Sequence, residues 1–275
     1  MWLCVSEITP IFFTCFLYIC SKEKQLARYF LQLAYDGSNY CGWQVQPGVN
    51  TVQEEVEKAL AIFVKDLGRV VGCGRTDTGV HASSFFLHFE TAMSLPEDLI
   101  FKLNAVLPKD IAIMKAFPVS QDLHARFSAY SRSYDYFIHF SKNPFRNAYS
   151  VYHPRALNVE KLNAAAAFLV GKHDFTSFCK AKAQTKTNIC TVSSAEWKEI
   201  TDGVVFTITA NRFLRNMVRA IVGTMLPIGE EAVEPNQILT VVEKKSRTAA
   251  GKSAHPQGLF LKEIRYPEIN VTSNR

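Results

Sequence analysis

The clearest candidate for chemistry in the sequence is Asp77, which lies in a glycine-rich stretch from Gly72 to Ala82. Short runs of β-forming residues flank this stretch on both sides and predict two strands. Glycines at a turn of this kind permit a positive φ and a close approach of the backbone. Arg75 could hold the nearby carboxylate in its ionised form. Spacing alone leaves two interpretations open, a reactive carboxylate or a surface ion pair worth about 0–1 kcal/mol.

The run from Gly74 to Ala82 (GRTDTGVHA) resembles the signature of the TruA family of tRNA pseudouridine synthases. The resemblance implies that Asp77 is the catalytic residue and that Arg75 lies at the site of the extruded nucleotide. It also implies the reaction, in which uracil is detached from ribose at N1–C1′, turned and rejoined through C5. A carboxylate suits this reaction because it can attack covalently or stabilise an oxocarbenium-like centre. The sequence does not decide which carbon Asp77 attacks.

A second motif contains Arg132, Tyr134 and Tyr136, and it resembles the R-x-Y-x-Y segment of the same family. The resemblance makes Tyr134 the active-site tyrosine, and Arg132 is expected to contact the substrate. The Tyr134 ring could stack on the target base, and its phenol could handle a proton at C5. Alternation alone instead favours two core tyrosines on one face of a strand, and we expect that role for Tyr136.

A third motif supplies positive charge from Arg212, Arg215 and Arg219. A helix predicted over residues 213–226 would place these arginines on one side, at about 100° per residue, and apolar residues on the other. With no acid between them, the arginines suit phosphate binding, although a solvated helix face has the same pattern. The segment resembles the family's F-x-x-x-M-V-R-x-I-V-G helix, which implies that Arg219 pairs with the catalytic carboxylate.

Two further segments are expected to contact the substrate. Trp43 lies in a stretch that resembles the family's D-G-x-x-Y-x-G-W-Q-x-Q segment, and its ring could face RNA or pack inside a glycine-rich loop. Leu259 belongs to a segment similar to A-P-x-x-G-L-x-L, which implies an apolar wall of the uracil pocket. The chain departs from the family pattern at Cys179, where arginine is frequent, and at residues 84–85, where Gly-Gln is common and where we expect local repacking.

The elements that must position these residues follow a repeated order. Alternation predicts strands that include residues 28–35, 111–119 and 259–265. A capping box at Thr51 and a capping serine at Ser94 predict the starts of two helices. The first half then has the order β-α-β-β-α-β, and the second half repeats it. We therefore expect an α+β protein built from two ferredoxin-like (split β-α-β) halves.

The family's fold, by resemblance, joins the antiparallel sheets of two such halves and leaves a central cleft between them, as in the pseudouridine synthase fold. We expect the N-terminal half, residues 25–120, to carry Asp77 and the C-terminal half, residues 121–275, to complete the cleft. Residues 1–24 do not fit this pattern. Their apolar run is shorter than the roughly 20 residues that span a bilayer and lacks a basic leader, so we expect a non-functional or mis-started extension.

Composition narrows the classes of function. The chain has 275 residues, 48% of them hydrophobic, and a net charge of +6, which favours a polyanionic partner. Its seven cysteines form no CxxC pair, which argues against a disulfide framework or a zinc site and favours a reducing compartment. The run from Ala250 to Ser253 resembles the end of a P-loop, but Ser246 replaces the required first glycine. We therefore expect neither a nucleotide nor any other cofactor.

Together these motifs predict a TruA-type enzyme that converts uridine to pseudouridine in tRNA. The resemblance implies action at positions 38, 39 and 40 of the anticodon stem–loop, a homodimer, and a cytoplasmic location. Two alternatives stay open at this point. A non-catalytic tRNA-binding or RNA-folding protein would keep the arginines without needing Asp77 and Tyr134 together, and a nucleosidase would release the base instead of rejoining it.

Overall fold

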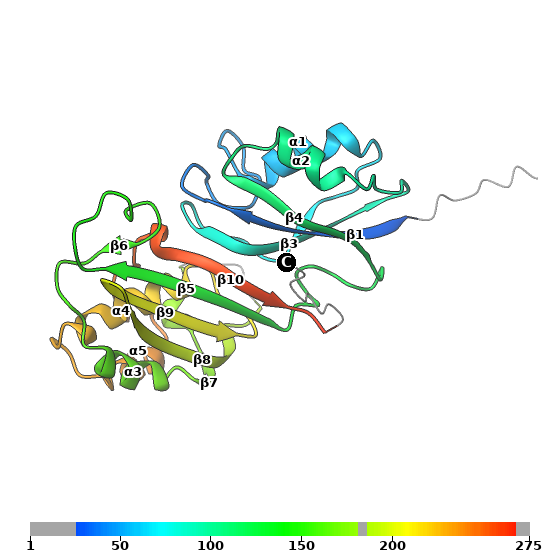
Figure 1. Cartoon of the computed structure of the whole chain (residues 1–275). Helices are drawn as coiled ribbons and strands as arrows, with labels where there is room; N and C mark the ends of the chain where they lie inside the picture. The colour runs from blue at the N-terminus through cyan, green and yellow to red at the C-terminus, as the bar shows by residue number, and fades with distance from the viewer. Residues whose placement is uncertain (1–25, 181–185, 268–275) are drawn as a thin grey trace, which may run out of the picture.

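The computed structural model describes residues 26–180 and 186–267, and Figure 1 shows its elements. The N-terminal extension expected over residues 1–24 lies outside the described residues. The strands are β1 (Ala27–Tyr35), β2 (Val71–Gly72), β3 (His81–Thr91), β4 (Ile111–Val119), β5 (Ser131–His139), β6 (Val151–Tyr152), β7 (Gly171–Asp174), β8 (Ile189–Ile200), β9 (Gly203–Ala210) and β10 (Leu259–Arg265). The α-helices are α1 (Val52–Phe63), α2 (Leu99–Val106), α3 (Val159–Ala167), α4 (Met217–Gly229) and α5 (Gln237–Glu243). Short 3-10 helices lie at Thr176–Phe178, Arg247–Ala249 and Pro256–Gly258.

One sheet runs through the described part of the chain. Its strand order is β4-β1-β3-β10-β5-β9-β8-β7, with β2 paired to β3 and β6 paired to β5. Most neighbours are antiparallel, and the parallel pairs are β10 with β3 and β5 with β6. The protein is therefore of the mixed α+β class with a large, mostly antiparallel sheet. The last strand, β10, lies between β3 and β5, so the C-terminal end of the chain connects the early strands to the later ones.

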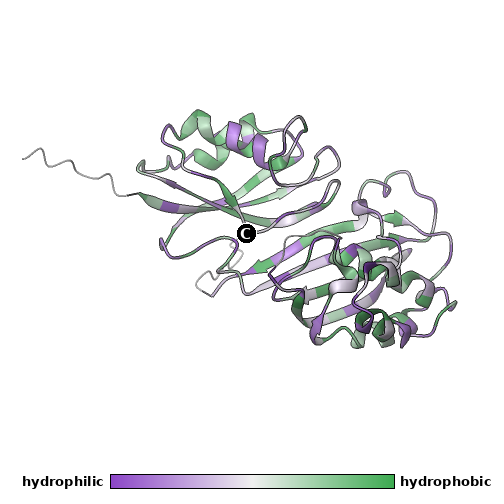
Figure 2. Cartoon of the chain, turned by 180° about the vertical axis from the view of Figure 1, so that it is seen from behind, coloured by the Kyte–Doolittle hydropathy of each residue, from purple (hydrophilic) through white to green (hydrophobic). Residues whose placement is uncertain are grey.

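The helices cover the sheet from the outside. In Figure 1, α1 and α2 lie above β1, β3 and β4, whereas α3, α4 and α5 lie below β5, at the lower left beside β8 and β9. Figure 2 shows hydrophobic and hydrophilic residues side by side on these helices, as expected for elements with one face on a core. The α1 helix buries Val52, Val56 and Leu60, which recur at the spacing of one helical face.

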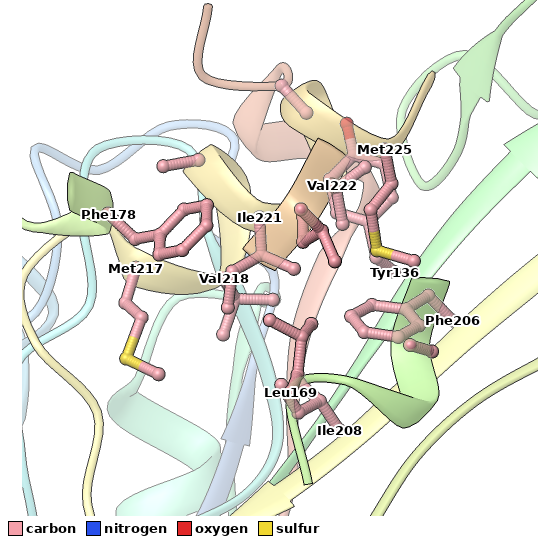
Figure 3. Packing of buried hydrophobic residues seen from close by; sticks show 14 of the residues in the cluster. Tyr136, Leu169, Phe178, Phe206, Ile208, Met217, Val218, Ile221, Val222 and Met225 are labelled. Carbon is pink, nitrogen blue, oxygen red and sulfur yellow. The ribbon is translucent and has the colours of Figure 1, made fainter. Parts of the chain in front are cut away.

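The buried residues form two hydrophobic clusters. One surrounds β1, β3 and α1, and it contains Phe30, Trp43 and Phe85. The other surrounds α4, and Figure 3 shows residues of this helix packed near Phe206 and Ile208 of β9. Burial of a side chain of this size contributes roughly 1.5–3 kcal/mol. The two clusters anchor the loops that carry the candidate site, because those loops leave from buried strands and helices.

The first predicted helix start is confirmed without its predicted cap, and the second was wrong. Thr51 lies at the N-cap of α1, but its side chain makes no capping hydrogen bond. The first helical N–H groups, of Val52 and Gln53, instead donate to the carbonyls of Gly42 and Trp43 at 3.2 and 2.9 Å. The α2 helix begins at Leu99, well after Ser94, because a turn from Pro96 precedes it. The predicted strands at residues 111–119 and 259–265 match β4 and β10.

The predicted start of the arginine-bearing helix was also wrong. Helix α4 begins at Met217, so Arg212 and Arg215 lie in the loop before it and only Arg219 lies on the helix. Asn216 takes a left-handed conformation, with φ of 67°. The Arg215 carbonyl accepts a hydrogen bond from the N–H of Lys180 at 3.0 Å. In a helix the same oxygen would accept from the N–H four residues later in the chain. The three arginines therefore do not form a stripe on one helix.

Candidate active site

Asp77 lies on the loop between β2 and β3, and a neighbouring loop supports its backbone. The N–H of Gly79 donates to the Tyr40 carbonyl at 3.3 Å, and the Tyr35 hydroxyl contacts Thr76 Oγ1 at 2.9 Å. A Cβ at Gly42, where φ is +87°, would lie 2.3 Å from the carbonyl oxygen of Thr76. Glycine is required at this position because both the positive φ and the close approach exclude a side chain. The segment after β1 thus fixes the loop that carries the carboxylate.

Two arginines from the later part of the chain face this carboxylate. Arg215 Nε lies 3.7 Å from Asp77 Oδ1, and Arg219 Nη1 lies 3.7 Å from Oδ2. At this separation the charges attract without hydrogen-bond contact, so the carboxylate oxygens stay accessible to a reacting atom. The Arg219 guanidinium is itself held, since its Nε donates to the Ala254 carbonyl at 2.7 Å. The structure therefore brings Arg219 to Asp77 as expected, and it adds Arg215 despite the altered start of α4.

Tyr134 of β5 lies beside the same loop. Its ring meets that of Phe213 edge-on at 5.0 Å, and it lines a small pocket together with Arg75, Thr76 and Leu261. The pocket has room for about one water molecule, so a base that enters must displace side chains. Burial raises the pKa of the Tyr134 phenol well above its usual value, which keeps it protonated at neutral pH.

Tyr136 has the structural role predicted for it. Its side chain is buried in the cluster around α4, and its hydroxyl donates to the His255 carbonyl at 2.8 Å. Leu259 pairs with Tyr136 across the β10–β5 ladder and is also buried in that cluster. Two residues further along β10, Leu261 pairs with Tyr134 and lines the small pocket. Sequence reasoning missed Leu261, although its period-two spacing from Leu259 could have indicated it.

The guanidinium of Arg132 makes four hydrogen bonds within the protein, and its contact with substrate stays a prediction. Its Nη1 donates to the carbonyls of Ala129 and Asn211, both at 2.9 Å. Its Nη2 donates to the carbonyls of Arg126 at 2.6 Å and Cys73 at 3.4 Å. Arg132 thus ties together three segments around the pocket, one of which leads into the loop of Asp77. The motif match did not reveal these hydrogen bonds, because all four acceptors are backbone carbonyls and leave no mark on the residue types of the sequence.

Trp43 is also buried, and the predicted contact of its ring with RNA is contradicted. Its side chain is 2% exposed and stacks on Phe85 with 4.1 Å between ring centroids. A Cβ at Gly72 would lie 2.5 Å from Trp43 Nε1, so the ring also covers the strand before the catalytic loop. Phe85 of β3 is likewise buried and packs against this ring. Trp43 acts as core, not as a surface ring.

The remaining arginines gather near the pocket without a matching acid. Arg75 is exposed, and among residues 26–180 and 186–267 its guanidinium forms no ion pair with Asp77 or another carboxylate. Partial burial lowers the pKa of Arg126, and the charges of Arg75, Arg132 and Arg212 lower it further. These four guanidinium groups therefore lie close enough to repel one another. Such a cluster is typical of a surface that meets phosphates.

His81 and Cys179 serve the packing around the site. His81 is 1% exposed, its Nδ1 accepts from the N–H of Gly37 at 3.1 Å, and its ring stacks on Phe260 at 4.5 Å. Burial lowers the pKa of His81, which favours a neutral ring and a packing role. Cys179 is 7% exposed, so its side chain faces the interior.

Neither a metal site nor a membrane span is evident in the described part of the chain. Within residues 26–180 and 186–267, no group of three or more His, Cys, Asp or Glu side chains gathers in an arrangement that could bind a metal ion. In the same ranges, none of the helices has both the length and the apolar character needed to cross a bilayer.

Comparison with known proteins identifies the family. The sequence model of the tRNA pseudouridine synthases matches residues 33–128 and 165–267. The protein named tRNA pseudouridine synthase A from Azobacteroides pseudotrichonymphae is 44% identical over 241 residues, which cover 87% of this chain and 97% of that protein. Proteins of the same name from Parabacteroides distasonis and Bacillus subtilis are 45% and 44% identical, covering 88% and 85% of this chain and 97% of each relative. With Asp77 set opposite Arg215 and Arg219 in a matched motif, the chain belongs to the TruA-type family of tRNA pseudouridine synthases.

Proposed function

We propose that this protein converts uridine to pseudouridine in tRNA, with Asp77 as the nucleophile. The observation that carries the proposal is the ion-pair geometry of Asp77, whose two oxygens each have an arginine nitrogen at 3.7 Å. The two positive charges hold the carboxylate in position for covalent attack on the substrate. The N1–C1′ bond breaks and a C5–C1′ bond forms, while C5 loses a proton and N1 gains one, so the composition of the RNA is unchanged and no cofactor or metal is consumed.

The other site residues are given the following roles. Arg219 holds the Asp77 carboxylate from α4, and Arg215 supplies a second, more exposed charge that can turn toward a phosphate. Tyr134 stacks on the base, because its ring lines the pocket beside Arg75 and Thr76. Arg75 contacts the extruded nucleotide, and extrusion itself costs a few kcal/mol. Leu259 and its neighbour Leu261 form the apolar wall.

The finer assignments are also proposals. We place the reaction at positions 38, 39 and 40 of the anticodon stem–loop, in a cytoplasmic homodimer, on the basis of the family resemblance. We also propose that residues 25–120 and 121–275 form two ferredoxin-like halves with a cleft between them. The helices of the two hydrophobic clusters support that division, since α1 and α2 pack in one cluster and α3, α4 and α5 in the other, whereas β10 contributes residues to both. Light scattering tests the dimer, and mapping of the modified nucleotide tests the positions.

The decisive experiment compares wild type with Asp77→Ala on an unmodified tRNA that has uridine at position 39. Pseudouridine is measured by carbodiimide-stop primer extension, and tRNA binding is measured in parallel. Asp98→Ala is the matched control, because that carboxylate lies in an exposed ion pair with Lys102 on the surface of α2. We expect wild type and Asp98→Ala to modify the tRNA and Asp77→Ala to bind without modifying it.

Other outcomes would contradict the proposal in different ways. Wild type that binds tRNA but forms no pseudouridine at any of the three positions would be a binding protein. Loss of uracil from the RNA, seen as a lower mass, would make it a nucleosidase. Unchanged activity in Asp77→Ala would remove this carboxylate from the mechanism.

A further inference from the structure

Phe127 is an exposed aromatic residue next to the candidate active site that has no role in the proposed reaction. Its side chain is 75% exposed, on the segment between β4 and β5. The guanidinium carbon of Arg126 lies 5.6 Å from the centre of its ring, and the His124 ring lies 4.4 Å away in a tilted arrangement. A single exposed phenylalanine is common on protein surfaces, so its surroundings must decide whether this one has a function.

The backbone that presents Phe127 is fixed by His124. Nδ1 of His124 accepts hydrogen bonds from the N–H groups of Arg126 at 3.1 Å and Phe127 at 3.2 Å. The main chain of Ser128 donates to the His124 carbonyl, and the Ser128 hydroxyl accepts from the His124 N–H at 2.9 Å. Four bonds within five residues hold the ring in one place before any ligand arrives. Preorganisation of this kind lowers the entropy cost of binding.

The segment is joined directly to the loop that carries Asp77. Nη2 of Arg132 donates to the carbonyls of both Arg126 and Cys73, and Cys73 lies at the start of that loop. Nη1 of the same guanidinium donates to the carbonyl of Asn211, the residue before Arg212. Phe127 is therefore adjacent in space to the catalytic loop and to the loop that precedes α4.

The charge around Phe127 is positive and uncompensated. Arg75, Arg132 and Arg212 all lower the pKa of the Arg126 guanidinium through their charges. No ion pair joins these four arginines to a carboxylate in the described ranges. An exposed aromatic ring beside a cluster of cations is the combination that binds unpaired nucleotides, since the ring stacks on a base while the cations meet the flanking phosphates.

We propose that Phe127 is a stacking platform for an unpaired base of the substrate RNA next to the extruded uridine. Arg75, Arg126 and Arg212 hold the phosphates on either side of that base. The proposal rests on the proposed function, because extrusion of a uridine breaks the stack and leaves the neighbouring base without a partner. A second copy of this chain fits the surface less well, since it would bring more positive charge against the four arginines.

The test uses three substitutions of Phe127 and one matched control. Phe127→Ala removes the ring, Phe127→Leu keeps an apolar side chain without a π-face, and Phe127→Trp keeps an aromatic ring. Phe101→Ala is the control, because Phe101 is 77% exposed and lies on the outer helix α2. Binding of unmodified tRNA and the rate of pseudouridine formation are measured for each variant.

We expect Phe127→Ala and Phe127→Leu to bind tRNA roughly 5- to 100-fold more weakly, the range of one base stack, and Phe127→Trp to stay within about twofold of wild type. Phe101→Ala should match wild type. The slope of log Kd against log salt should be unchanged in Phe127→Ala, because no charge is removed, whereas Arg126→Gln should reduce it by about 1. A 2-aminopurine placed beside the target uridine should be quenched by wild type and less by Phe127→Leu.

The outcomes separate this proposal from the proposed function. If wild type forms pseudouridine and Phe127→Ala binds as tightly as Phe101→Ala, the platform is wrong and the function stands. If Phe127→Leu keeps full affinity, the ring does not act by stacking. If wild type forms no pseudouridine but Phe127→Ala still loses affinity, the platform stands without the reaction. A change in molecular mass on light scattering in Phe127→Ala would make this surface an interface between copies and overturn the proposal.

Discussion

Replacing Arg132 tests whether its guanidinium positions the site or contacts RNA. Arg132→Lys keeps the charge, but one ammonium cannot reproduce a planar fork that reaches four carbonyls on three segments. Two of the four bonds, to Ala129 and Cys73, are partly buried, and the bond to Cys73 is long at 3.4 Å. The bonds to Arg126 and Asn211 are exposed, so water can replace them.

The size of the effect follows from these four bonds. A hydrogen bond that involves a charged group contributes about 1.5–3 kcal/mol, and an exposed one contributes less. We therefore expect Arg132→Lys and Arg132→Gln each to lower the free energy of unfolding by about 2–4 kcal/mol. Both should also lower kcat, because the three segments next to the pocket are no longer held together by hydrogen bonds to one side chain. Arg265→Lys is the control, since Arg265 forms an exposed ion pair with Glu263 worth at most about 1 kcal/mol.

The assay combines urea unfolding with tRNA binding and single-turnover kinetics on the same preparations. A positioning role predicts loss of stability and of kcat in both variants and an unchanged salt dependence of binding. The reasoning is refuted if Arg132→Lys unfolds like wild type and retains its activity while Arg132→Gln loses one unit of salt slope. That pattern would mean that the charge of Arg132 meets a phosphate.

Two further predictions concern the support of the site. Gly42→Ala should lower both stability, by at least about 1–2 kcal/mol, and kcat, because its Cβ would lie 2.3 Å from the Thr76 carbonyl oxygen. Gly48→Ala is the control, because Gly48 also has a positive φ but has open space around it. Urea unfolding should show only the loss of stability caused by backbone strain, and kcat should be normal. Burial lowers the pKa of His88 to about 4, so the unfolded chain binds the proton first and stability should fall as pH drops from about 6.5 to about 4. Urea unfolding across that range should give a shallower fall for His88→Asn, and an equal fall would exclude His88 as the cause.

The strands were predictable because their signal is local. Alternation marked residues 111–119 and 259–265, and the structure has strands over the same residues. A period-two pattern is set by which face of a strand is buried, and that information is present in each short segment. The start of α4 was not predictable in this way. Its apolar spacing continues before Met217, but the bond between Lys180 and Arg215 comes from a loop distant in sequence.

The motifs in the sequence predicted which residues lie at the candidate site, but they did not predict the role of each residue. Asp77, Arg219 and Tyr134 were named from matched motifs, and the structure brings all three to one region. Arg132 and Trp43 come from equally good matches, yet one holds backbone carbonyls and the other is buried. A motif records that a residue type is required at a position. It does not say whether the requirement comes from the substrate or from the protein.

The arrangement of the strands explains why the site needs the whole chain. The loop of Asp77 lies between β2 and β3, whereas Arg215 and Arg219 lie just before and on α4. Strand β10 lies between β3, which follows the Asp77 loop, and β5. It pairs with β3 through His81 and Ala82 and with β5 along most of its length. This last strand therefore joins the strand that follows the Asp77 loop to the strands that lead to the two arginines. The placement of the two arginines beside Asp77 thus depends on the complete sheet, so the motif alone does not supply the charges that face its carboxylate.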